Sequence, residues 1–72
     1  MEYECRITRS CIYWDPEERD IMDFIIVADS ELEARAKLRQ KAIRVDIRSG
    51  SKLVQDIMIR RDGEWVPVSV RG

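Results

Sequence analysis

The 72-residue chain contains no histidine, two cysteines, three glycines and two prolines. Histidine is the commonest general base and metal ligand, so its absence removes the usual catalytic and metal-binding arrangements. Two sulfurs without histidine are too few ligands for a structural zinc site. No glycine belongs to a phosphate-binding loop pattern. These absences predict a protein that is not an enzyme and that holds no metal or cofactor.

Long hydrophobic runs are absent too. The longest apolar run covers residues 24–28, whereas a membrane span needs about 20 apolar residues and the core of a signal peptide about 7–15. The first residues of the chain are acidic and polar. We therefore expect a cytoplasmic protein with no targeting segment and no contact with a membrane.

The length and the two cysteines limit the architecture. Seventy-two residues make one domain, 1–72, and a chain of this size buries only about 60% of the surface of its unfolded form. If Cys5 and Cys11 share one strand, they lie about 20 Å apart, beyond disulfide reach. We expect two reduced thiols, at least one of which packs as a small apolar side chain.

Two pairs of segments have strand patterns. Alternation predicts a strand over residues 2–14, and apolar β-branched residues predict another over 21–28, whose near-continuous apolarity favours a central position in a sheet. Strands over 53–61 and 64–70 flank Asp62-Gly63, a dipeptide typical of two-residue hairpin turns. Pro67 indicates that the last strand lies at an edge, because proline cannot donate to a ladder.

A helix is predicted between the hairpins. Ser30 begins a capping-box pattern, and Ala34, Leu38 and Ala42 recur at helical spacing to form an apolar face. Residues 43–48 then alternate apolar and charged. We expect the helix to end at about residue 42–44 and a short strand to follow, with a longer helix as the alternative.

The order β-β-α-(β)-β-β indicates an α+β fold. It predicts a two-layer sandwich, in which one helix covers one face of an antiparallel sheet of four to five strands. The other face of the sheet is left open. That face is therefore either polar or in contact with a partner.

Charge is divided unevenly along the chain. Residues 1–29 contain three basic and eight acidic residues, a net charge of −5, whereas residues 30–72 contain ten basic and six acidic residues, a net charge of +4. The total of −1 argues against nucleic-acid binding by bulk charge. The division predicts an acidic hairpin and a basic remainder.

The acidic residues gather in the turn of the first hairpin. Carboxylates beside an aromatic anchor suit docking to a basic protein surface, such as one that holds nucleic acid. The candidate protein-binding residues are Trp14, Asp15, Glu17, Glu18 and Asp20. A charged loop that only keeps the hairpin soluble is the alternative.

The basic residues allow a second interpretation. A basic edge can contact phosphates, and the candidate nucleic-acid-binding residues are Arg44, Arg48, Lys52, Arg60 and Arg61. The few aromatic residues are not interleaved with them as a stacking platform requires. An edge strand protected by charge is the alternative.

The segment 24–42 carries a resemblance. A strand passes through the pattern Ser-x-x-Glu-Ala, which begins at Ser30, into a helix rich in lysine and arginine. This step, with the length and element order, resembles small phage and mobile-element proteins, including anti-CRISPR-type inhibitors. The resemblance implies a small, non-catalytic protein of the bacterial cytoplasm that occupies a partner's surface. It transfers no site residues.

Three hypotheses follow. The first is a phage or mobile-element inhibitor, such as an anti-CRISPR protein, whose acidic hairpin blocks a nucleic-acid-handling protein complex of the host. The second is a nucleic-acid-binding module that uses the basic edge. The third is a regulatory domain that self-associates, so that the chain is either a monomer or a homodimer through the open sheet face.

Overall fold

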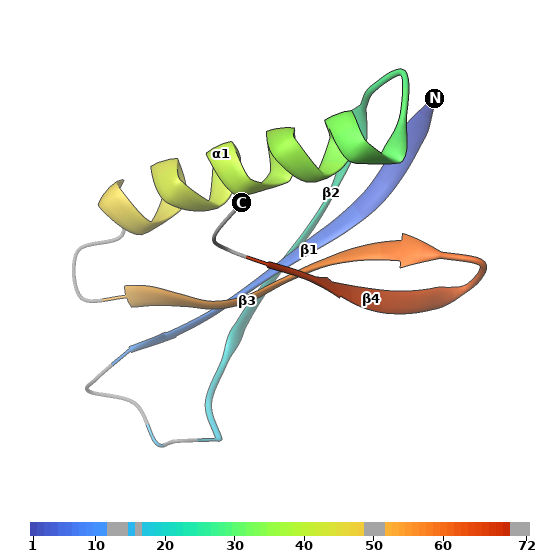
Figure 1. Ribbon diagram of the computed structural model, residues 1–72. Coiled ribbons are helices and arrows are strands. Elements are labelled where there is room, and N and C mark those ends of the chain that lie inside the picture. Colours follow the sequence, from blue (N-terminus) through green and yellow to red (C-terminus); the bar gives the residue numbers. More distant parts are fainter. Residues whose placement is uncertain (12–14, 16, 49–51, 70–72) are drawn as a thin grey trace.

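The computed structural model describes residues 1–11, 15, 17–48 and 52–69 (Figure 1). Its elements are β1 (Glu2–Cys11), β2 (Asp20–Val27), α1 (Glu31–Arg48), β3 (Lys52–Arg61) and β4 (Glu64–Val68). The four strands form one antiparallel sheet, and α1 runs across one face of it. This confirms the α+β fold with a single helix on a four-stranded sheet.

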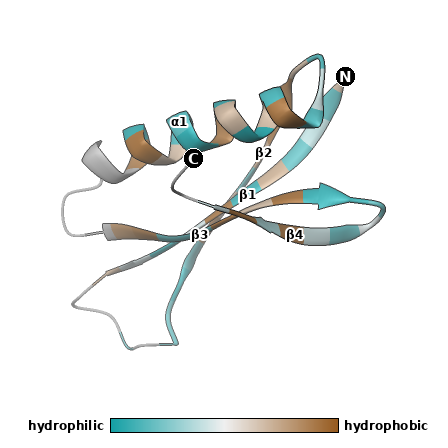
Figure 2. Cartoon of the chain, in the orientation of Figure 1, coloured by the Kyte–Doolittle hydropathy of each residue, from teal (hydrophilic) through white to brown (hydrophobic). Residues whose placement is uncertain are grey.

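The helix begins at its predicted cap. The Glu33 amide donates to Ser30 Oγ at 3.2 Å, and the Ala34 amide donates to the Ser30 carbonyl at 2.9 Å. Acidic residues occupy the first turn, where they complement the helix dipole. Ala34, Leu38 and Ala42 are buried against the sheet as their spacing predicts. Figure 2 shows hydrophilic and hydrophobic residues in successive bands along α1.

The end of the helix differs from the prediction. α1 continues to Arg48, so residues 43–48 form no strand. Val45 lies three residues after the buried Ala42 and packs against the core, whereas Ile43 is exposed. The apolar spacing that matters is therefore helical rather than alternating. Adding residues to an existing helix costs little compared with starting a new strand, because the helix nucleus is already formed.

The strand order is β2-β1-β3-β4. β4 lies at an edge, as Pro67 indicates. β2 also lies at an edge, so the expectation of a central position is wrong. Its burial alternates along the strand because only one face is covered. Ile21, Ile25 and Val27 lie on the uncovered face and are 56%, 57% and 63% exposed.

The core lies between α1 and the two central strands. Cys5 and Ile7 of β1, Ile57 and Ile59 of β3, and Leu38 of α1 are almost completely buried. Cys5 and Cys11 both carry reduced thiols, and Cys5 packs as an apolar side chain, as expected. Burial raises the pKa of the Cys5 thiol to about 11. In the described part of the chain, no helix is long and apolar enough to cross a membrane.

Candidate protein-binding surfaces

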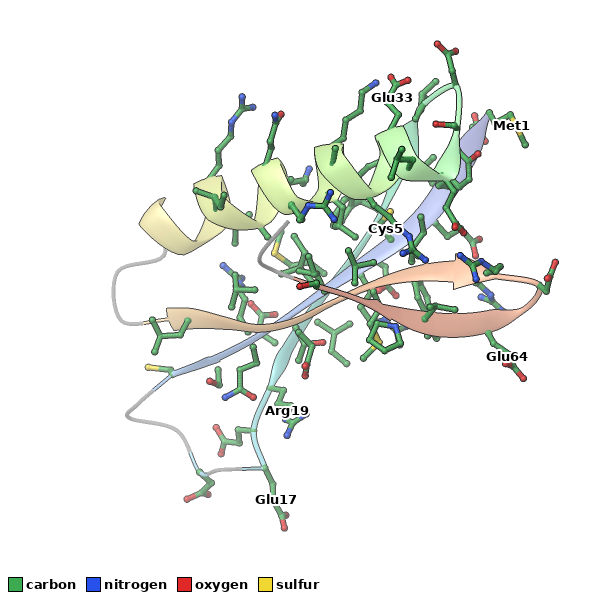
Figure 3. The ribbon with its side chains drawn as sticks, viewed as in Figure 1. Met1, Cys5, Glu17, Arg19, Glu33 and Glu64 are labelled. Carbon is green, nitrogen blue, oxygen red and sulfur yellow. The ribbon has the colours of Figure 1, made fainter. Side chains whose placement is uncertain are left out.

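The turn between β1 and β2 presents three of the predicted acidic residues. Asp15, Glu17 and Glu18 are exposed, and the Glu18 amide donates to the Asp15 carbonyl at 2.9 Å. Figure 3 shows the Glu17 side chain pointing away from the sheet at the end of the hairpin. No ion pair within the described residues includes these three carboxylates. They are therefore available to an external partner.

Two predicted members of this site stand apart from the turn. Asp20 is the first residue of β2 and forms an ion pair with Arg9 across the β1–β2 ladder. Its side chain is only one-third exposed, so its charge is held within the domain. Trp14 lies outside the described residues. The structure thus brings together Asp15, Glu17 and Glu18 and places Asp20 in an internal pair.

Two predicted members of the basic edge are held by carboxylates. Arg60 contacts Glu4 at 3.4 Å, and Arg61 Nε donates to Glu31 Oε1 at 2.8 Å. This second hydrogen bond is the main cause that lowers the pKa of the Glu31 carboxyl below its ordinary value. Because each guanidinium is already paired, it offers less positive potential to a phosphate.

The remaining basic candidates lie on α1 and at the start of β3. Arg44 is exposed on α1. Arg48 ends α1 and Lys52 begins β3, and only the backbone is described for these two residues. Of the three candidates whose side chains are described, Arg44 alone forms no ion pair with a described carboxylate.

The open face of the sheet carries a network centred on Arg6. Arg6 Nε and Nη2 donate to the two carboxylate oxygens of Asp23 at 2.7 and 3.0 Å. The same guanidinium lies 4.3 Å from the centre of the Trp65 ring, and that of Arg60 lies 5.7 Å from it. The hydrogen bond from Arg6 lowers the pKa of the Asp23 carboxyl below its ordinary value. Charge at the middle of this face is thus largely internally balanced.

Beside this network, β2 presents an apolar strip that the sequence pattern does not mark as a surface. The strip consists of Ile21, Ile25 and Val27. Its signal in the sequence is the near-continuous apolarity of residues 21–28, which predicts a central strand instead. An edge strand with apolar side chains on both faces is a feature that soluble domains usually avoid. The strip is therefore a second candidate surface.

The described residues contain no group of three or more cysteine, aspartate or glutamate side chains placed to hold a metal ion. No family model matches the chain, and neither a curated protein nor a solved structure matches it. The function must therefore be argued from these surfaces alone.

Proposed function

We propose that this chain is a small protein-binding domain that docks the acidic turn of its first hairpin on a basic surface of a partner protein. The exposure of Asp15, Glu17 and Glu18, which form no ion pair with a described cation, carries this proposal. Elsewhere in the described part, most charges of the sheet are matched in pairs. A partner with the opposite charge gains the most attraction where the charge is unmatched.

The kind of partner follows from this chemistry. A surface that holds nucleic acid is basic, and closely spaced carboxylates can occupy it in place of phosphates. The finer proposal is an inhibitor of phage or mobile-element type, such as an anti-CRISPR protein, that blocks a nucleic-acid-handling complex in this way. The resemblance over residues 24–42 supports the class of protein and leaves the particular complex open.

Nucleic-acid binding by the basic edge is the weaker proposal. Arg60 and Arg61 would have to leave Glu4 and Glu31 before contacting phosphates. The exchange of one anion for another yields less free energy than the pairing of a free cation.

The test compares two double charge reversals. Glu17→Lys with Glu18→Lys changes the acidic turn, and Glu2→Lys with Glu64→Lys changes two exposed carboxylates elsewhere by the same net charge. Each tagged variant is used to capture proteins from a bacterial lysate, and the captured proteins are identified by mass spectrometry. We expect the wild type and the control to retain the same nucleic-acid-handling complex and the turn variant to lose it.

Circular dichroism must show that both variants remain folded. Equal recovery of the complex by the turn variant would exclude the acidic turn as the contact. Capture of nucleic acid alone, lost on adding salt, would favour the basic edge instead.

A further inference from the structure

The backbone of β2 has hydrogen-bonding groups on its outer side that no described strand satisfies. The hydrogen bonds at one end of the strand show which residues carry these groups. The Ala28 amide donates to the Met1 carbonyl at 3.0 Å, and the Met1 ammonium donates to the Ala28 carbonyl at 3.0 Å. In an antiparallel ladder, pairs that exchange hydrogen bonds alternate with pairs that do not. With Glu2 opposite Val27, the even-numbered residues of β2 are therefore bonded to β1.

The odd-numbered residues of β2 direct their amides and carbonyls away from the sheet. These residues are Ile21, Asp23, Ile25 and Val27. An independent contact agrees with this assignment: the Val27 carbonyl accepts a hydrogen bond from Lys37 Nζ at 2.8 Å instead of one from β1. No described strand pairs with this side of β2. Apart from the Val27 carbonyl, the outward groups form an open ladder.

We propose that β2 pairs antiparallel with β2 of a second copy of this chain, which joins two four-stranded sheets into one sheet of eight strands. The two-fold axis passes between Phe24 of one copy and Phe24 of the other. Odd-numbered residues then face odd-numbered residues, so outward backbone groups meet outward backbone groups. Side chains on the helix-covered face also meet side chains on the same face of the second copy.

The side chains of β2 are self-complementary in this register. Ile21 lies opposite Val27 of the second copy, and Met22 lies opposite Ile26. Asp23 lies opposite Ile25, where Arg6 already neutralises its charge. The pairing brings the apolar side chains of the strip into lateral contact with those of the second copy, which buries part of the apolar surface that is exposed on an isolated edge.

The flanking charges select this register among the three nearest ones. It places Arg19 opposite Asp29 of the second copy, and the two-fold axis repeats the pair. Asp29 is exposed, and Arg19 approaches Asp56 only at 4.0 Å. A shift of the second β2 strand by two residues in one direction places Asp23 opposite Asp23 of the second copy. A shift by two residues in the other direction places Ile21 opposite Asp29. Opposite charges across strands are favourable and like charges are unfavourable.

The helix leaves room for this contact. α1 packs mainly on β3, and its contacts with β2 are fewer. Phe24 is half-buried, with the Lys41 ammonium 4.4 Å from the centre of its ring. In the dimer the two helices lie on the same face of the extended sheet. The acidic turns lie beyond the paired segment, so the dimer keeps them accessible and its formation does not depend on the proposed function.

The test measures the oligomeric state and the hydrogen exchange of the intact chain. Sedimentation equilibrium should show a monomer–dimer equilibrium for the wild type. Ile25→Lys should give a monomer, because a lysine in the middle of the edge opposes strand pairing while its exposed position leaves the fold intact. Amide exchange at Asp23, Ile25 and Val27, whose acceptors in the second copy are open, should slow as the protein concentration rises. The amides of Met22, Phe24 and Ile26 should be protected at every concentration.

Charge reversals test the register. Arg19→Asp and Asp29→Arg should each raise the dissociation constant about tenfold, because each turns two attractive pairs into repulsive ones. The double variant should return it to within about threefold of the wild type. Glu17→Lys with Glu18→Lys should leave the dimer intact, which separates this test from that of the acidic turn.

Three results would overturn the proposal. One is a wild-type chain that stays monomeric at millimolar concentration, whether or not its edge captures an added extended peptide. Another is a dimer in which the odd-numbered β2 amides exchange as fast as in the monomer, because the contact then lies elsewhere. A double charge variant as weak as the single ones would reject the register.

Discussion

The two edges of the sheet differ in how they are closed to further strands. β4 has five residues, contains Pro67 and follows the tight turn at Asp62 and Gly63. Both turn residues have positive φ, 51° and 81°, as a type I′ hairpin requires. In such a hairpin the two residues that flank the turn, here Arg61 and Glu64, exchange backbone hydrogen bonds. The backbone groups of Trp65 and Pro67 therefore point away from β3, toward the open side of β4. Proline therefore removes a donor at the place where a new strand would attach.

β2 has neither the proline nor the short length of β4, and the charges of its two aspartates, Asp20 and Asp23, are paired with arginines of β1. It has eight residues, with no proline or lysine, and apolar side chains on both faces. A single lysine from the helix, Lys37, reaches the carbonyl at one end of it. Natural sheets usually protect edges with proline, charge or short length. The contrast between the edges indicates that β4 is closed and that β2 is kept available.

The largest expected effect comes from proline substitutions at adjacent positions of β2. Ile26→Pro removes an amide bonded to β1 and should lower the free energy of unfolding by about 3 kcal/mol or more. Ile25→Pro removes only an outward amide and should lower it by about 1 kcal/mol or less. Urea denaturation at low protein concentration measures both values.

Alanine controls are needed because Ile26 is buried and Ile25 is exposed. The effect of proline minus that of alanine isolates the backbone contribution at each position. Equal backbone contributions at the two positions would refute the assignment of inward and outward amides, and with it the view of β2 as an open ladder.

The next effect concerns the central strand to which the β2 edge is attached. Cys5 lies opposite Phe24 of β2 and Ile59 of β3. Its pKa is raised by burial from 9.0 to about 11, so the folded state binds the proton more tightly than the unfolded state. The resulting stability is complete below pH 9 and is lost as the pH rises to 11. The loss should be about 2–3 kcal/mol.

Cys5→Ala isolates this contribution from every other effect of pH on stability. The variant is less stable at neutral pH because it loses buried volume. Its free energy of unfolding should nevertheless fall less steeply between pH 9 and 11. Parallel pH profiles for the wild type and the variant would contradict the prediction.

Local patterns allowed much of this fold to be predicted. The Ser30 cap, the spacing of Ala34, Leu38 and Ala42, and the Asp62-Gly63 turn each specify a structure through contacts between near neighbours. The edge position of the last strand followed from Pro67, whose backbone nitrogen has no hydrogen to donate to a neighbouring strand. These features depend on a few residues and on no distant contact.

The errors lie where distant contacts decide the outcome. The apolarity of β2 shows that its side chains favour burial. It does not show whether another segment of the same chain packs beside the strand or on its second face. The alternation of residues 43–48 fits a strand or a helix, and the burial of Val45 near the core decides for the helix. The pairing of Asp20 with Arg9 depends on strand register, so the candidate site included a carboxylate that the fold uses internally.

The smallest expected effect tests whether Pro67 closes the other edge. Pro67→Val restores an outward amide on β4 and adds a residue that favours strands. Since Pro67 is exposed and Met58 lies opposite it, the free energy of unfolding should change by about 1 kcal/mol or less. The substitution is made in the Ile25→Lys background, in which the β2 edge is blocked.

Sedimentation then reports on β4 alone. The Ile25→Lys chain should be monomeric, and Pro67→Val in that background should restore a weak association, because β4 offers five residues where β2 offers eight. Pro67→Ser is the matched control: it restores the same amide without the preference for strands, and its association should be weaker still. If neither variant associates, the turn and the short length of β4 protect this edge without help from its proline. The difference between the two edges would then reflect length rather than a blocked donor.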